Sequence, residues 1–356
     1  MNISPSLLPS WPLSWGLTAS QCHLIALIFA SSYVGSIYLT QHVFLPRAIL
    51  ASAAATQAKA AQGSAAKASN ASHVDVSSKA FRDDDDDEDD DEEEDDAPKL
   101  GTRDHPTTIR LRMKAVGIAT VSSLLIVWSV VKHLSGTSWT ESLLPTIRLL
   151  GLSIPSFSCL SWTWIFPYLL TPILFLGPLF AEYLDRSLPF QRSSSSPLAQ
   201  KLIQLFDFSI IDYRNYVVGP ITEELTFRSA IIAIFLLSHA SPSSIVFGSP
   251  LWFGTAHIHH AWEVYRSGGS TSQSAQRAVL TSLIQFTYTT LFGWFASYLF
   301  IRTGSVFPPL ASHIFCNRMG IYLPGRAARR HPSSKTAILC AYVAGMAGFI
   351  LCLWVY

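Results

Sequence analysis

The feature that most constrains this chain is a series of apolar stretches, each close to the length of a membrane-crossing helix. They fall at roughly 22–40, 115–131, 163–183, 215–237, 243–260, 277–301, 304–322 and 336–356. About 20 apolar residues in a helix cross the hydrocarbon core of a bilayer, and a helix satisfies its own backbone hydrogen bonds there. The sequence therefore predicts an all-α, polytopic membrane protein with about eight transmembrane helices.

The charge distribution supports this fold class. Only 14% of the 356 residues are charged, against about 25% in an ordinary soluble protein. An unbroken acidic run over residues 83–96 holds 14 of the 24 acids, which leaves 10 acids against 25 bases elsewhere. A chain with so few polar groups to cover a surface is not a soluble enzyme. The Ala/Ser-rich and acidic segment 51–105 cannot bury enough apolar surface to fold, so we expect a disordered linker there.

The basic residues indicate how the chain is oriented in the membrane. Loops on one side of the eight predicted spans hold 21 of the 25 Lys and Arg residues, and loops on the other side hold 3. Basic loops stay in the cytosol, so the acidic linker is predicted to be cytosolic. The stretch 143–160 is interrupted by Arg148 and Pro155. It is either an interfacial helix or part of the third span.

The fourth span carries three ionisable side chains, which are costly inside a membrane and mark functional sites. Glu224 and Arg228 are four residues apart, so they share a helix face and can form an intramembrane ion pair. Glu223 points about 100° away from Glu224 on a helix of 3.6 residues per turn. No basic residue of the same span shares its face. We therefore expect Glu223 to act as a general base.

Two further spans carry polar residues at a matching depth. The fifth span ends at His257 and His260, which share a helix face. In the seventh span His313 and Asn317 are four residues apart and face together, which a helix-packing hydrogen bond alone could also explain. With Glu223, these side chains could line one cavity with a base, a partner for its proton and two oxyanion donors.

Other chemistries lack their sequence signs. Five dispersed cysteines with no CxxC give neither a disulfide framework nor a thiolate zinc site. His257, His313 and Glu223 are residue types that bind zinc, but no His-Glu-x-x-His motif is present. A nucleophilic Gly-x-Ser-x-Gly motif is also absent. We expect no cofactor, with zinc on the same residues as the alternative.

At these positions the sequence resembles the type II CAAX prenyl endopeptidases of the wider CPBP (ABI) family. Three separated motifs match in order and spacing, and the resemblance is strong over 200–325. The motifs are Glu223-Glu224-x-x-x-Arg228, Phe253-x-x-x-His257 and His313-x-x-x-Asn317. The resemblance implies a bundle of eight helices around a cavity open to the cytosol and to lipid.

The resemblance also implies an activity and a set of roles. Glu223 and His257 would activate water, His313 and Asn317 would hold the oxyanion, and Glu224 and Arg228, with Phe253 and His260, would support the site. The substrates would be farnesylated or geranylgeranylated CaaX proteins in the endoplasmic reticulum membrane, which lose their last three residues.

The corresponding organisation is an N-terminal region over 1–50 with the first transmembrane helix, the linker over 51–105, and a catalytic transmembrane domain over 106–356. The alternatives are a zinc-dependent membrane peptidase, a CPBP protease that acts on peptides without a prenyl group, and a non-enzymatic scaffold or transporter. Membrane lipid is an expected partner and nucleic acid is not, and the oligomeric state stays open.

Overall fold

The computed structural model describes residues 3–7, 16–40, 104–153, 162–188, 191, 207–238, 240–256 and 259–355. Within these ranges every regular element is a helix and there is no strand. The predicted linker lies outside them from residue 51 to residue 103, as does His257. Two compact units are distinguished, one of Met1–Ser36 with Met113–Tyr356 and one of Ile37–Arg112. The first unit holds all the side chains discussed below.

Helices occupy each of the eight predicted stretches. The N-terminal elements are η1 (Pro5–Leu7), α1 (Ala19–Leu39), α3 (Pro106–Ser135), α4 (Trp139–Leu149), α5 (Trp162–Leu174) and α6 (Leu176–Leu184). A nearly continuous run follows: α8 (Ile210–Tyr213), η4 (Arg214–Val218), α9 (Gly219–Glu224), η5 (Leu225–Ala230) and α10 (Ile231–Leu236). The C-terminal elements are α11 (Pro242–Ala256), α12 (His259–Ser267), α13 (Ser272–Thr303), α14 (Phe307–Met319), α15 (Pro324–Arg330), η6 (Pro332–Ser334) and α16 (Lys335–Val355).

Three of the described helices are long and apolar enough to cross a membrane by themselves. They are α1, α3 and the stretch Pro332–Val355 that contains α16. The pair Trp164–Leu174 and Leu176–Leu184 would be a fourth span, bent by 63°. These spans and the all-helical content confirm an all-α polytopic membrane protein.

The third predicted stretch is interrupted by prolines, and in the structure it is bent. Pro172 lies within α5 and Pro178 within α6, and the bend falls between them at Phe175. A proline inside a helix removes one backbone hydrogen bond and pushes the preceding turn aside, which accounts for the bend. The stretch after residue 138 also forms a helix of its own, α4, whose capping box joins Ser138 and Glu141.

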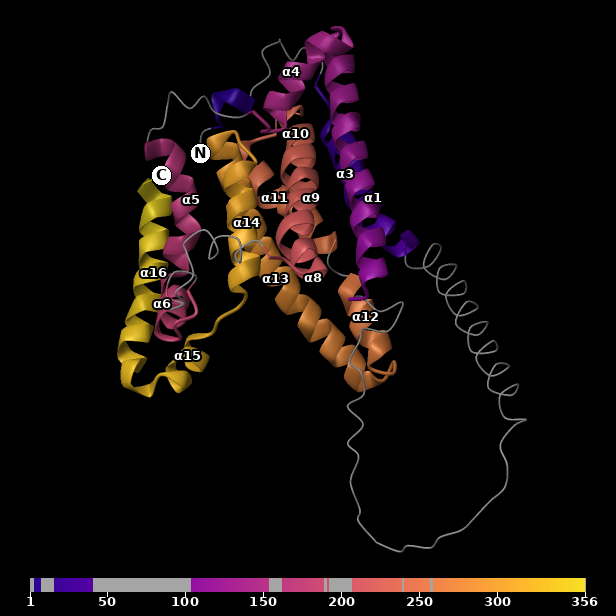
Figure 1. Cartoon of the computed structure of the whole chain (residues 1–356). Coiled ribbons are helices and arrows are strands. Elements are labelled where there is room, and N and C mark those ends of the chain that lie inside the picture. Colours follow the sequence, from indigo (N-terminus) through magenta and orange to yellow (C-terminus); the bar gives the residue numbers. More distant parts are fainter. Residues whose placement is uncertain are drawn as a thin grey trace, which may run out of the picture. The chain divides into compact units, whose positions relative to one another are not determined.

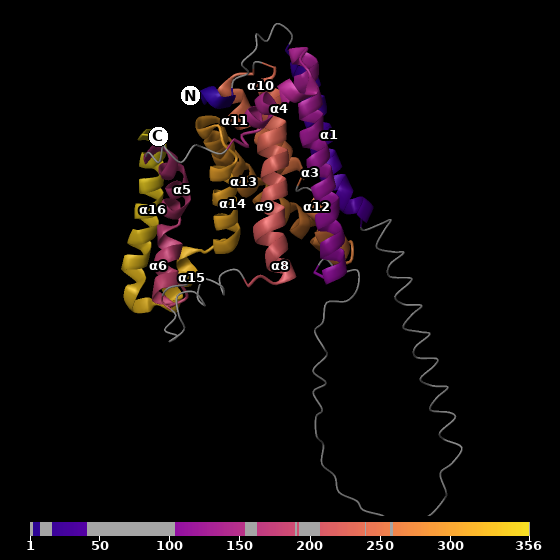
Figure 2. The same cartoon turned by 45° about the horizontal axis from the view of Figure 1, so that its top comes forward.

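The end of the run from α8 to α10, over η5 and α10, is buried inside the first unit. Every residue from 226 to 237 is buried. Figures 1 and 2 show α9 and α10 between α1 and α3 on one side and α13 and α14 on the other. Tyr33 of α1 packs edge-on against Phe227, and the hydroxyls of Thr120 of α3 and Thr226 lie 3.1 Å apart. The helical run from α9 to α10, which carries Glu223, Glu224 and Arg228, is therefore packed against elements that are distant in the sequence.

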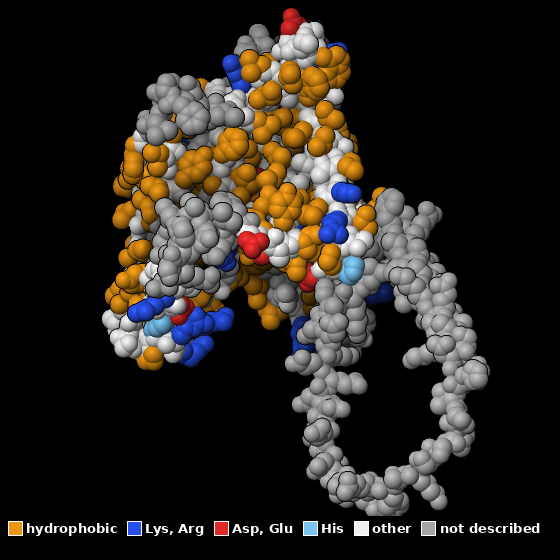
Figure 3. Space-filling model, viewed as in Figure 1, with side chains coloured by type: hydrophobic (Ala, Val, Ile, Leu, Met, Phe, Trp, Pro, Cys, Tyr) orange, Lys and Arg blue, Asp and Glu red, His pale blue; other side chains and the backbone are white. Residues whose placement is uncertain are grey.

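The outer surface of the helices is largely apolar (Figure 3). Exposed large apolar side chains follow three of the longer helices: Ile118, Val121 and Leu125 on α3, Val279, Leu280, Leu283 and Ile284 on α13, and Val343, Met346, Ile350 and Leu351 on α16. Contiguous apolar surface of this kind is typical of contact with lipid or with another protein.

A polar contact fixes the short helix α15 beside the end of α6. Asp185 accepts hydrogen bonds from Arg330 at 2.6 Å and from Tyr322 at 3.2 Å, and its other oxygen lies 2.7 Å from Nε2 of His331. Burial raises the pKa of the Asp185 carboxyl, but the hydrogen bonds from His331 and Arg330 outweigh burial and hold the pKa below its ordinary value. The carboxylate thus ties α6 to the segment that leads into α16.

Candidate active site

The predicted ion pair of the fourth span is present and fully buried. Nη1 of Arg228 donates to Oε1 of Glu224 at 3.0 Å, and the two side chains are 1% and 0% exposed. The guanidinium of Arg228 also lies over the rings of Phe253, at 4.4 Å, and Phe292, at 5.4 Å. Aromatic faces and a carboxylate together stabilise a charge that has left water. Phe253 therefore contacts the ion pair through Arg228.

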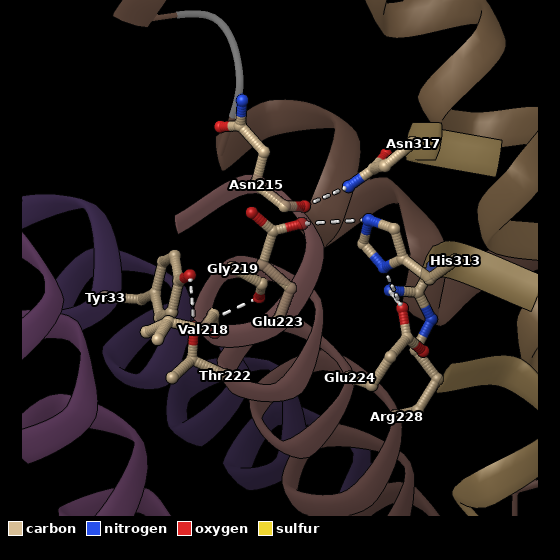
Figure 4. A network of polar contacts seen from close by, with 10 residues as sticks. All are labelled: Tyr33, Asn215, Val218, Gly219, Thr222, Glu223, Glu224, Arg228, His313 and Asn317. Carbon is tan, nitrogen blue, oxygen red and sulfur yellow. Dashed lines mark hydrogen bonds and ion pairs between the residues drawn. The ribbon is translucent and has the colours of Figure 1, made fainter. Parts of the chain in front are cut away.

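His313 connects this ion pair to Glu223. Its Nδ1 lies 2.7 Å from Oε1 of Glu224, and its Nε2 lies 3.6 Å from Oε2 of Glu223. Figure 4 shows the two carboxylates on opposite sides of the one imidazole. Because an ionised carboxylate only accepts, Nδ1 carries a proton and donates it to Glu224. The ring orientation is therefore fixed by Glu224, and Nε2 is directed toward Glu223.

The two glutamates differ in their access to solvent. The side chain of Glu223 is 22% exposed, whereas that of Glu224 is 0% exposed and paired with Arg228. The distance of 3.6 Å between Oε2 of Glu223 and Nε2 of His313 is longer than the length of a hydrogen bond. A reacting group can therefore approach Glu223 but not Glu224.

Asn317 lies one turn further along α14, at the exposed end of the site. Its Nδ2 donates to the backbone carbonyl of Asn215, in η4, at 2.9 Å. An amide nitrogen carries two protons, so this bond fixes the plane of the Asn317 amide and uses only one of them. His313 and Asn317, both on α14, thus face the helical run that carries Glu223 and Glu224, as Figure 4 shows.

Hydroxyl groups hold the turn that precedes the glutamates. Oγ1 of Thr222 donates to the carbonyl of Val218 at 2.8 Å. The hydroxyl oxygen of Tyr33 lies 2.9 Å from Oγ1 of Thr222. Both segments beside α9, η4 and η5, are π-helical, and π-helical turns occur frequently at functional sites. Tyr33 therefore joins α1 to the turn that carries Glu223.

Two predicted residues are not placed by these contacts. His257 lies outside the described residues, and His260 belongs to α12 at a position whose side chain is not described. Among the side chains that are described, no three His, Cys, Asp or Glu residues are grouped to hold a metal ion. Zinc on Glu223, His313 and His257 is thus not tested by the described part of the chain.

Sequence reasoning missed three contributors to the site. Asn215, Tyr33 and Phe292 come from other segments, and their contacts join residues 102, 189 and 21 positions apart in the sequence. None of them has a motif of its own. An intramembrane tyrosine opposite the ionisable span is the only signal that could have pointed to Tyr33.

The sequence is similar to those of known proteins. A family model described as "Type II CAAX prenyl endopeptidase Rce1-like" matches residues 162–319. A human protein named CAAX prenyl protease 2 is 34% identical over 255 residues, which are 70% of this chain and 72% of that protein. The chain belongs to the type II CAAX prenyl endopeptidase family. The matched range contains every motif residue from Glu223 to Asn317.

More distant organisms carry relatives of the same family. The Saccharomyces cerevisiae protein named CAAX prenyl protease 2 is 30% identical over 243 residues, 64% of this chain and 75% of that protein. The Arabidopsis thaliana protein of the same name is 32% identical over 201 residues, 53% of this chain and 62% of that protein. No solved structure matches the chain. The family assignment therefore rests on sequence, and the geometry above shows how a type II CAAX prenyl endopeptidase arranges its motif residues in this chain.

Proposed function

We propose that this protein is an intramembrane endopeptidase that removes the C-terminal aaX tripeptide from prenylated CaaX proteins. The observation that carries the proposal is the solvent-accessible carboxylate of Glu223, 3.6 Å from an imidazole whose other nitrogen is held by the buried Glu224. The relatives described above, each named CAAX prenyl protease 2, supply the substrate class. A positioned carboxylate beside an imidazole supports activation of water for attack on a carbonyl.

Glu223 acts as the general base in this mechanism. With His257, it takes a proton from water while the water oxygen attacks the carbonyl carbon of the prenylated cysteine. The tetrahedral intermediate then collapses, and its C–N bond breaks. The leaving amine takes the proton back from Glu223. The products are a protein that ends in a prenylated cysteine carboxylate and a free tripeptide.

His313 and Asn317 stabilise the oxyanion of the intermediate. Because Nδ1 of His313 already lies against Glu224, Nε2 is the ring nitrogen left to face the oxyanion, and it donates there when it carries a proton. Asn317 contributes the amide proton that its bond to Asn215 does not use. Donors fixed in place before the reaction stabilise developing charge without a cost of reorganisation.

The membrane setting fits such a substrate. A farnesyl or geranylgeranyl chain can stay in the hydrocarbon, beside the exposed apolar faces of the helices, while the peptide enters the polar site. We place the site on the cytosolic side of the endoplasmic reticulum membrane, on the basic-loop asymmetry and on the family. The proposed chemistry uses no metal, because base and oxyanion donors are all side chains.

The test measures release of the tripeptide from a farnesylated CaaX peptide by the purified protein in detergent. Glu223→Gln should lower kcat by at least about 100-fold, the usual contribution of a positioned base. The matched control is Glu182→Gln, on α6, where the carboxylate accepts a hydrogen bond from Ser187, just after that helix. Its activity should equal that of the wild type.

The other outcomes separate the alternatives. Equal cleavage by wild type and Glu223→Gln contradicts the proposed base. Loss of cleavage on adding a zinc chelator, with recovery on adding zinc, favours the metallopeptidase. A folded wild type that cuts no prenylated peptide contradicts the enzyme and favours the scaffold or transporter.

A further inference from the structure

Arg318 lies next to Asn317 at the exposed end of the candidate active site. It is on the last turn of α14, and its side chain is exposed. Its guanidinium carbon is 6.0 Å from the ring centroid of Tyr216, the residue after Asn215. The contact between Asn317 and Asn215 and the contact between Arg318 and Tyr216 are therefore neighbours. Together they join α14 to η4.

The positive charge of Arg318 has no acidic partner in the described part of the chain. The ion pairs there involve Glu223, Glu224 and Asp185, and none of them includes Arg318. An arginine is charged at every physiological pH, and its planar guanidinium matches a carboxylate through two parallel hydrogen bonds.

Arg318 is displaced from the reacting groups toward the exposed end of α14. It comes five residues after His313, which is about 7.5 Å along the axis of α14 and about 140° around it. Its guanidinium therefore leaves α14 on another side than the imidazole and lies by Tyr216 of η4. An extended chain advances about 3.3–3.6 Å per residue, so a few residues beyond the cut bond cover a separation of this order.

We propose that Arg318 binds the C-terminal carboxylate of the substrate. This inference rests on the proposed function, because it takes the substrate to be a peptide with a free C-terminus. Arg214, whose Nε donates to the side chain of Asn215 at 2.9 Å, adds a second positive charge at the same end of the site. Arg318 is the positioning group, and the chemistry stays with Glu223.

The test compares two farnesylated CaaX peptides that differ only at the C-terminus, one a free acid and one an amide. The wild type should cut the acid with a kcat/KM at least tenfold above that of the amide. Arg318→Gln should lower kcat/KM for the acid at least tenfold, mainly through KM, and should leave the amide unchanged. Arg318→Lys keeps the charge without the planar fork, so it should retain part of the preference.

Arg326→Gln is the matched control, since Arg326 is another exposed arginine, on α15. It should behave as the wild type with both peptides. Equal cleavage of acid and amide by the wild type overturns the proposal, and so does an unchanged acid preference in Arg318→Gln. Either result leaves the proposed function standing, because cleavage is still seen. Cleavage of neither peptide by folded wild type instead overturns the proposed function, and this inference with it.

A binding measurement gives a readout that does not depend on turnover. In the Glu223→Gln background the same two peptides, carrying a fluorophore, can be titrated by anisotropy. The acid should bind at least tenfold more tightly than the amide, and the added Arg318→Gln should remove that difference. Equal affinities before the second substitution would contradict the carboxylate contact.

Discussion

Replacing Arg228 by Met should destabilise the protein far more than replacing both members of its ion pair. Nη1 of Arg228 and Oε1 of Glu224 are 3.0 Å apart, and neither side chain is more than 1% exposed. At an effective dielectric constant of about 20, two unit charges at that distance attract by about 5.5 kcal/mol. Removing one partner leaves the other charge buried, which costs about 3–5 kcal/mol of unfolding free energy.

The double variant Arg228→Met with Glu224→Gln removes both charges. The amide oxygen at position 224 can still accept from Nδ1 of His313, so the imidazole keeps its orientation. We expect the double variant to cost at least about 2 kcal/mol less than the sum of the single variants, since residues in one network couple by up to about 3 kcal/mol. The unfolding free energy is measured by titration with SDS in mixed micelles, followed by tryptophan fluorescence.

Arg326→Met is the control for loss of an arginine, and as a surface change it should stay within about 0.5 kcal/mol of the wild type. Costs of the two single variants that add to within about 0.5 kcal/mol would refute the reasoning, because independent sites add in that way. A stable Arg228→Met variant would refute it as well, since the buried Glu224 would then keep its charge with only the hydrogen bond from His313.

Two further predictions concern packing and pH. A Cβ at Gly177 would collide with the ring of Tyr342, whereas one at Gly117 meets nothing within 4 Å. Gly177→Ala should therefore cost about 1–3 kcal/mol and Gly117→Ala should not destabilise, as thermal unfolding in detergent would show. The pKa of Asp185 lies below its ordinary value, so its contribution is present above about pH 3.9 and is lost as pH falls through the folded pKa. The acid side of the stability curve should flatten in Asp185→Asn, and an unchanged curve would contradict the contact with His331.

The sequence predicted local relationships well. The pair Glu224 and Arg228 follows from a spacing of four, because residues four apart share a helix face whatever surrounds the helix. The all-helical class and the positions of the helices follow from apolar length, which is also a property of one segment. Pro172 and Pro178 indicated an interruption near Leu174, although the angle of 63° depends on packing.

Contacts between segments could not be predicted in the same way. Spacing placed His313 beside Asn317, but its two nitrogens contact carboxylates 89 and 90 residues away. The partner of Asn317 is a backbone carbonyl, which every residue possesses, so no residue type marks it. Contacts of this kind form only when the helices pack against each other. The apolar pattern of each helix is compatible with many different helix pairings, so the sequence does not select one of them. The family resemblance named the residues, and the structure adds which atom contacts which.

The π-helical segment Leu225–Ala230 has a consequence for variation at this position. A wide turn of this kind is held in place by the residues on either side of it, and it has room for one residue more than a regular turn. Deleting a single residue there would let the helix close into regular α geometry, so the wide turn itself would take up the loss. A deletion within Ile231–Leu236 would instead rotate the residues after it by about 100°, the angle of one residue in a helix of 3.6 per turn. Every side chain in that stretch is buried, so the rotation would misalign a packed surface. Between the glutamates and the end of α10, the wide turn is therefore the place where loss of one residue should be tolerated best.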